Sequence, residues 1–106
     1  MQQEGFSEKY ALSKSFHEHR AAVRSVAVKG DRMLSAGIDK KVVLYTRQDN
    51  GIFEKTSEYT FFKDYVYTVE MMEDDEQFMV GCKDNKIYIC FFADTEGPML
   101  CLEGKN

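Results

Sequence analysis

Few residues of this chain have side-chain types and spacing that could do chemistry. His17 and His19 flank Glu18, and two imidazoles separated by one residue are weak grounds for a metal site when no further ligand lies nearby. His19, Ser35 and Asp39 supply the residue types of a hydrolase triad. No phosphate-binding loop, nucleophile elbow or zinc motif occurs. We therefore expect no catalytic residue, metal or cofactor, and an enzyme is the least favoured class.

Two further groups of residues also have a simple structural interpretation. The acidic run Met72–Glu76 lacks the glycine and the spaced ligands of a calcium loop, which favours a solvated hairpin turn. Cys82, Cys90 and Cys101 are an odd number without zinc spacing, so we expect free thiols in apolar strands. Free thiols are typical of a reducing compartment, the cytoplasm or the nucleus.

Composition excludes several classes of protein. The 106 residues are 43% hydrophobic and 13% aromatic, as in a folded single domain. The formal net charge of −4 gives no strong attraction to nucleic acid or to an anionic membrane. The first ten residues have no apolar core of a signal peptide, and no apolar run approaches the roughly 20 residues that span a bilayer. We expect neither a nucleic-acid nor a membrane partner.

The elements that must position these residues are strands. Apolar residues alternate with period two, and Val, Ile, Tyr, Phe and Thr are frequent where they do. The pattern predicts an all-β fold with nine short strands and no helix. These strands are Leu12–Phe16, Val23–Val28, Arg32–Ala36, Val42–Thr46, Thr56–Phe61, Val66–Met72, Phe78–Gly81, Lys86–Phe92 and Met99–Leu102.

A repeat is visible in the order of these strands. The stretch SAGIDKKVVLY contains Asp39, and the stretch VGCKDNKIYIC places Asp84 at the matching turn. Each stretch belongs to a set of four strands, and the set recurs after roughly 40 to 45 residues, which is typical of propeller blades. We therefore predict antiparallel four-stranded blades of a β-propeller: about two blades preceded by one outer strand.

The first unit, HRAAVRSVAVKGDRMLSAGIDKKVVLYT, resembles a WD repeat. The resemblance implies a structural hydrogen-bond network of His19, Ser35, Asp39 and Tyr45 that ties three strands together. Tyr45 stands where the family has tryptophan, and its hydroxyl lies farther from the backbone than an indole nitrogen. The second unit keeps only Asp84.

The predicted organisation divides residues 1–106 into three parts of a partial propeller. Residues 10–16 form the outer strand of the ring-closing blade, 17–61 form blade one and 62–106 form blade two. Two blades do not close a ring, and exposed sheet edges invite pairing. We expect either the N-terminal piece of a longer protein or a chain that completes its sheets as a homo-oligomer or by a strand swap.

Further positions are similar to one group of WD-repeat proteins, that of phospholipase A-2-activating protein and its yeast counterpart, the ubiquitin-fusion-degradation adaptor. The similar stretches are LS at Leu12–Ser13, the pattern HxxxVR from His19 to Arg24, and PMLCLEG from Pro98 to Gly104. Lys105 stands where that group has histidine. The resemblance implies a ubiquitin-binding adaptor in ubiquitin-dependent degradation, which reaches an AAA unfoldase only through domains that lie outside these 106 residues.

In WD repeats the loops on the top face commonly bind peptides or proteins. The resemblance places six positions there, which we predict as partner-binding residues: Ala22, Arg24, Ile38, Tyr65, Tyr67 and Lys83. Arginine and tyrosine are favoured at interfaces because they bury much area at a modest entropic cost. The alternative is that Tyr67 packs within its blade and Arg24 covers apolar surface. A WD-repeat scaffold that binds an unrelated peptide or protein is the second candidate function.

Overall fold

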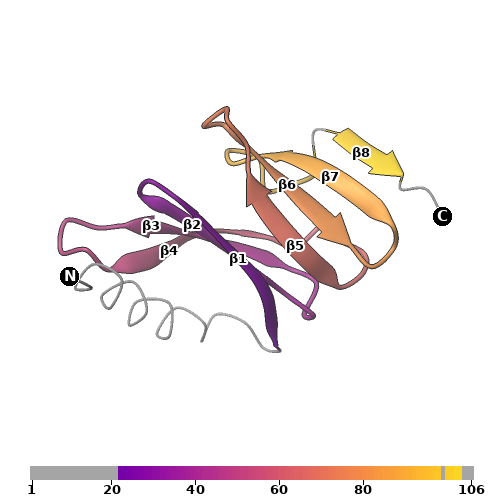
Figure 1. The fold of residues 1–106 in the computed structure, drawn as a ribbon, viewed down its shortest axis with the longest axis horizontal. Helices are drawn as coiled ribbons and strands as arrows, with labels where there is room; N and C mark the ends of the chain where they lie inside the picture. Colours follow the sequence, from indigo (N-terminus) through magenta and orange to yellow (C-terminus); the bar gives the residue numbers. More distant parts are fainter. Residues whose placement is uncertain (1–21, 99, 104–106) are drawn as a thin grey trace.

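In a computed structural model of the chain, residues 22–98 and 100–103 are described, and they form two four-stranded antiparallel sheets. The first sheet contains β1 (Val23–Lys29), β2 (Arg32–Gly37), β3 (Val42–Arg47) and β4 (Phe53–Tyr59), in that order. The second contains β5 (Val66–Met71), β6 (Gln77–Cys82), β7 (Lys86–Phe91) and β8 (Leu100–Glu103). Consecutive strands are neighbours throughout (Figure 1).

Eight of the nine predicted strands are confirmed, with small differences at their ends. The largest difference is in β4, which starts at Phe53 rather than at Thr56 because its first half pairs with the end of β3, where Arg47 faces Phe53. The ninth predicted strand, Leu12–Phe16, lies outside the described residues, as do His17 and His19.

The two sheets have the same internal register. The bulge between Val23 and Ser25 in β1 recurs between Val66 and Thr68 in β5. Ser25 pairs with Ala36 as Thr68 pairs with Gly81. A bulge is a specific local feature of a ladder, so its repetition shows that the two sheets are copies of one design at the level of backbone pairing.

The core lies between the sheets. The first sheet contributes Leu34, Ala36, Val42, Leu44 and Tyr59, and the second contributes Val66, Val69, Phe78, Val80, Cys82, Tyr88 and Cys90. Contact is closest along β5, which packs on β1 and β2 (Figure 1). A smaller cluster of Met33, Val43, Tyr45 and Phe53 is buried on the opposite side of the first sheet.

Hydrogen bonds and an ion pair also join the two halves of the fold. The buried hydroxyl of Tyr59 donates a 2.7 Å hydrogen bond to the carbonyl of Phe92, which directly follows β7 of the other sheet. On the surface, Lys29 Nζ donates to the carbonyls of Met72 and Glu73 at 2.8 and 3.0 Å, and it pairs with the Asp75 carboxylate at 3.3 Å. The prediction of a solvated hairpin turn at Met72–Glu76 is confirmed, while its bonds to Lys29 are a tertiary feature.

Removal of the Tyr59 hydroxyl should destabilise the junction of the sheets. We expect Tyr59→Phe to lower the free energy of unfolding by about 1–3 kcal/mol, because the buried carbonyl of Phe92 loses a donor. Burial raises the pKa of Tyr59 from 10.0 to about 12, so the stabilising contribution of the neutral hydroxyl is fully present below pH 10. That contribution is lost as the pH rises from 10 towards 12, and the variant should lose less stability over this range.

Urea unfolding at pH 8 and at pH 11 measures both effects, with Tyr65→Phe as the control. Tyr65 is 37% exposed, so loss of its hydroxyl should leave stability nearly unchanged. Equal stability of Tyr59→Phe and the wild type at pH 8 would contradict the proposed role of the Tyr59 bond.

The three cysteines are free thiols, as predicted, but only two are buried. Burial raises the pKa of both Cys82 and Cys90 from 9.0 to about 12, whereas Cys101 is exposed on β8. Because the thiolate is the reactive form, we expect Cys101 alone to react rapidly with an aromatic disulfide reagent at pH 8. Cys101→Ser should abolish the rapid phase, and a rapid phase that persists in this variant would contradict the burial of the other two thiols.

Candidate functional site

The six predicted partner-binding residues lie at the end of the molecule where β1 and β5 begin. Ile38 follows β2 and its N–H donates to the Ala22 carbonyl at 3.1 Å. Lys83 follows β6 and its N–H donates to the Tyr65 carbonyl at 2.9 Å. These two bonds occupy corresponding places in the two sheets, so the same turn geometry brings Ile38 and Lys83 beside the starts of β1 and β5.

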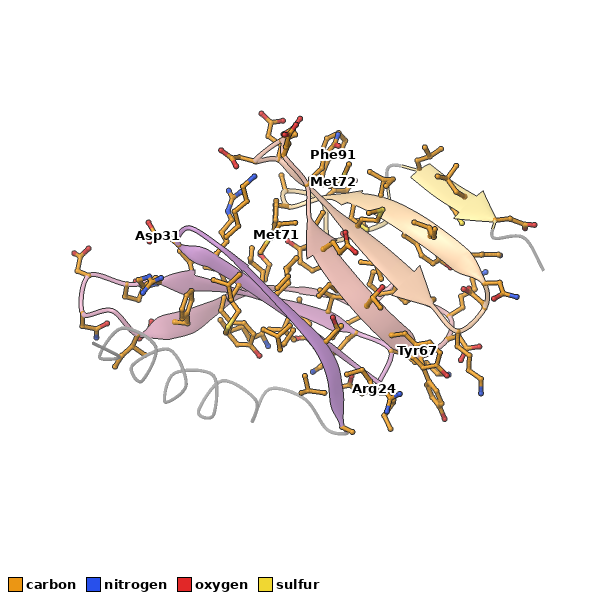
Figure 2. All side chains as sticks on the ribbon, in the orientation of Figure 1. Arg24, Asp31, Tyr67, Met71, Met72 and Phe91 are labelled. Carbon is orange, nitrogen blue, oxygen red and sulfur yellow. The ribbon has the colours of Figure 1, made fainter. Side chains whose placement is uncertain are left out.

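Two cations of this group lie on tyrosine rings. The Arg24 guanidinium carbon is 5.5 Å from the centre of the Tyr67 ring, and Lys83 Nζ is 5.2 Å from the centre of the Tyr65 ring. Figure 2 shows Arg24 and Tyr67 together at one end, whereas Asp31, Met72 and Phe91 lie towards the other. The rings remain 37% and 41% exposed for Tyr65 and Tyr67. We call the set Arg24, Ile38, Tyr65, Tyr67 and Lys83 the cation–tyrosine surface.

This arrangement can bind a partner without a large rearrangement. A cation–π contact holds each long cationic side chain over a ring, which lowers the entropy that binding would cost. Tyrosine offers a large amphipathic surface with only two side-chain torsions. The alternative in which Tyr67 packs within its own blade does not fit its exposure, although Arg24 does cover part of the Tyr67 ring.

The two turns behind this surface contain left-handed backbone, and the aspartate of the second turn accepts hydrogen bonds that fix it. Lys40 and Asn85 have φ values of 68° and 66° directly after Asp39 and Asp84. Asp84 accepts a 3.1 Å bond from the Lys86 N–H and a 2.9 Å bond from the Tyr88 hydroxyl. Burial and the bond to Asp84 raise the pKa of Tyr88, which keeps its hydroxyl neutral as the donor. The turn that carries Lys83 is thereby tied to β7.

The predicted structural network is partly described. The hydroxyls of Ser35 and Tyr45 are hydrogen-bonded at 3.2 Å, and both side chains are buried. The longer reach of tyrosine therefore does not prevent this contact. Asp39 is half-buried in the turn between β2 and β3, while His19 lies outside the described residues. Because Ser35 is completely buried, its hydroxyl is not placed for attack on a substrate.

The sequence interpretation missed two hydroxyls, those of Tyr59 and Tyr88. The Tyr59 bond depends on how distant parts of the chain meet, because its acceptor is the carbonyl of Phe92. Tyr88 gave one available signal: it stands four residues after Asp84, on the strand that follows the turn. A short hairpin turn places such an acceptor and donor within reach of each other.

Other candidate binding sites in the described part of the chain are weaker than the cation–tyrosine surface. An open hollow of about 520 Å³ at the opposite end is lined by Lys29, Gly30, Asp31, Arg32 and Asp75. Its two cations already bond the turn Met72–Glu76, since Lys29 pairs with Asp75 and Arg32 donates to the Asp75 carbonyl. Among residues 22–98 and 100–103, no three His, Cys, Asp or Glu side chains gather as metal ligands would, and no helix is long and apolar enough to cross a membrane.

Comparison with known proteins establishes the fold alone. No known protein family and no curated protein matches the sequence. Among solved structures, 309 chains match, so the arrangement is a widespread one. They include the crystal structure of the computationally designed Ika4 protein, with a TM-score of 0.67 and 15% sequence identity over 82% of this chain. The match covers 51% of the Ika4 chain, so the present chain spans about half the length of that protein.

This likeness agrees with the repeated register and the face-to-face packing of the sheets. At 15% identity it carries no information about a partner or an activity. The chain is an all-β protein whose two four-stranded antiparallel sheets resemble the blades of a β-propeller.

Proposed function

We propose that this chain is a protein-interaction module that binds a protein partner through the cation–tyrosine surface. The observation that carries the proposal is the exposure of two tyrosines at the start of β5, one beneath Arg24 of the first sheet and the other beneath Lys83 of the second. Arg and Tyr are enriched among the residues that dominate binding energy at interfaces. An enzyme is disfavoured because Ser35, the nucleophile among the residue types that could form a hydrolase triad, is buried.

The finer proposal is that the two sheets are WD-repeat blades of a ubiquitin-binding adaptor, similar to the group of phospholipase A-2-activating protein. The Ser35–Tyr45 contact supports the WD-repeat interpretation, since it joins two members of the expected network. Ubiquitin presents an apolar patch ringed by basic residues. Ile38 and the rings of Tyr65 and Tyr67 would contact the apolar part of that patch, and link to an unfoldase would require domains outside these 106 residues.

A second candidate partner is an acidic peptide, and one observation favours it. Arg24 and Lys83 are the charged side chains that lie over the two rings, and they would repel the basic rim of ubiquitin but attract carboxylates. The two partners would respond differently to a change of charge at Arg24. Reversal of this charge would weaken binding of an acidic peptide through electrostatics. For ubiquitin, the loss of support for the Tyr67 ring would weaken binding, while attraction to the basic rim would oppose that loss.

Titration of the isotope-labelled 106-residue chain with mono-ubiquitin, followed by NMR, tests the finer proposal. We expect shift changes at the cation–tyrosine surface, and we expect Arg24→Glu with Tyr65→Ala to weaken binding about tenfold or more, equivalent to about 1.4 kcal/mol. The control is Lys55→Glu, the same charge reversal on β4, which should leave the affinity unchanged.

Unchanged affinity in the double variant would exclude this surface as the ubiquitin site. The same titration with a poly-glutamate peptide separates the two candidates. Binding of this peptide that falls steeply with added salt, together with no response to ubiquitin, would favour the acidic partner. No response to either probe would contradict both assignments.

A further inference from the structure

The first sheet packs one of its two sides on the second sheet. The corresponding side of the second sheet faces away from the first. In each sheet we call this side the leading face. Register equivalence defines it: Ala36, Val42 and Tyr59 are cross-strand neighbours in the first sheet, and Gly81, Ile87 and Leu102 are the same neighbours in the second.

The leading face of the second sheet is apolar apart from Thr68 and Glu70 on β5, and it is not covered by another sheet of the described chain. In the first sheet the face consists of Leu34, Ala36, Val42, Leu44 and Tyr59, all buried in the core. The corresponding residues of the second sheet are Met79, Gly81, Ile87, Ile89 and Leu102. Ile87 is 38% and Leu102 is 47% exposed. Exposed apolar surface of this extent on a sheet commonly marks an interface.

The leading face also contains a hollow of about 120 Å³, lined by Thr68, Glu70, Met79, Gly81 and Ile87. The absence of a side chain at Gly81 keeps it open, since a Cβ there would lie only 2.7 Å from Thr68 Oγ1. Thr68 corresponds to Ser25, whose hydroxyl accepts a 3.2 Å bond from the Val69 N–H of the adjoining sheet. The Thr68 hydroxyl therefore stands where it would accept an N–H from the first strand of another sheet.

β1, the first strand among the described residues, has side chains that match this hollow. In the existing junction β5 presents Val69 and Met71 to the first sheet, and their register equivalents in β1 are Val26 and Val28. These two valines are 37% and 44% exposed, on the side of β1 that faces away from the second sheet. They are small enough to fill the hollow over Gly81, and Val26 corresponds to the residue whose N–H binds Ser25.

We propose that the leading face of the second sheet binds β1 of a second copy of this chain, head to tail. Val26 and Val28 of the incoming copy fill the hollow, and its Val26 N–H donates to Thr68 Oγ1. The junction reproduces the β5 part of the packing that joins the two sheets within one chain, since Met33, Val43 and Tyr45 on the same side of the first sheet are already buried. Because the two contacting surfaces differ, the contact repeats from copy to copy and closes when the rotation between copies completes a ring. The cation–tyrosine surface lies at the ends of the strands and stays open.

Sedimentation equilibrium of the full 106-residue chain tests the proposal. At roughly 100 μM we expect the wild type to have the mass of two or more 12.3 kDa copies. Ile87→Glu on the leading face and Val26→Glu on β1 should each give a single copy, because each places a negative charge in the contact beside Glu70. Glu54→Lys, an exposed change on β4, is the control and should assemble as the wild type does.

A mixture of the two variants gives the sharpest result. The Val26→Glu copy keeps its leading face and the Ile87→Glu copy keeps its β1, so an equimolar mixture should form a pair that cannot extend. A wild type with the mass of one copy would overturn the proposal. So would a Val26→Glu variant that still assembles, since the leading faces would then bind each other. Circular dichroism of both variants shows whether the sheets are retained, and their assembly on mixing also requires folded copies.

Discussion

The apolar layer between the two sheets is the interaction on which the rest of the structure depends. Neither sheet has a core of its own on that side, because Leu34, Val42 and Tyr59 are buried in one cluster with side chains of the other sheet. A single four-stranded sheet buries one face at most, and burial of a large apolar side chain contributes about 1.5–3 kcal/mol. Face-to-face packing thus stabilises both sheets at once and fixes β5 against β1.

Placement of the candidate site follows from this packing. Arg24 is on β1 and Tyr67 is on β5, so their contact exists only because these strands adjoin across the junction. The pair Lys83 and Tyr65 is local to the second sheet and is set by the turn after β6. The position of the Arg24–Tyr67 pair therefore depends on tertiary packing, and that of the Lys83–Tyr65 pair depends on turn geometry. Both halves leave tyrosine rings exposed where a partner can reach them.

Repetition of one blade-like unit also explains why one outward side of the molecule is an exposed apolar sheet face. The first sheet packs its leading face on the second sheet. The leading face of the second sheet, which includes Ile87 and Leu102, has no such neighbour among the described residues. Open sheet surfaces of this kind favour association. The same geometry that makes the chain stable thus provides a surface for continued assembly, independent of partner binding at the strand ends.

The sequence by itself determined the strands, their order and the repeat, because period-two alternation and turn residues are local signals. It placed Asp39 and Asp84 in matching turns and brought Arg24, Tyr65 and Tyr67 to one end, since the topology of a repeated hairpin fixes which strand ends meet. The start of β4 was wrong by three residues, because the pairing of Phe53 with Arg47 overrides weak local propensity.

Only the tertiary structure decided which hydroxyls and cations bind across the junction. The bond from Tyr59 to Phe92, the bonds of Lys29 to the acidic turn and the contact of Ser25 with Val69 all join residues more than 30 positions apart. Their geometry depends on how two sheets lie against each other, which no local pattern encodes. The exposure of Tyr67 and Ile87 was decided in the same way, since alternation gives the face of a strand but not what covers it.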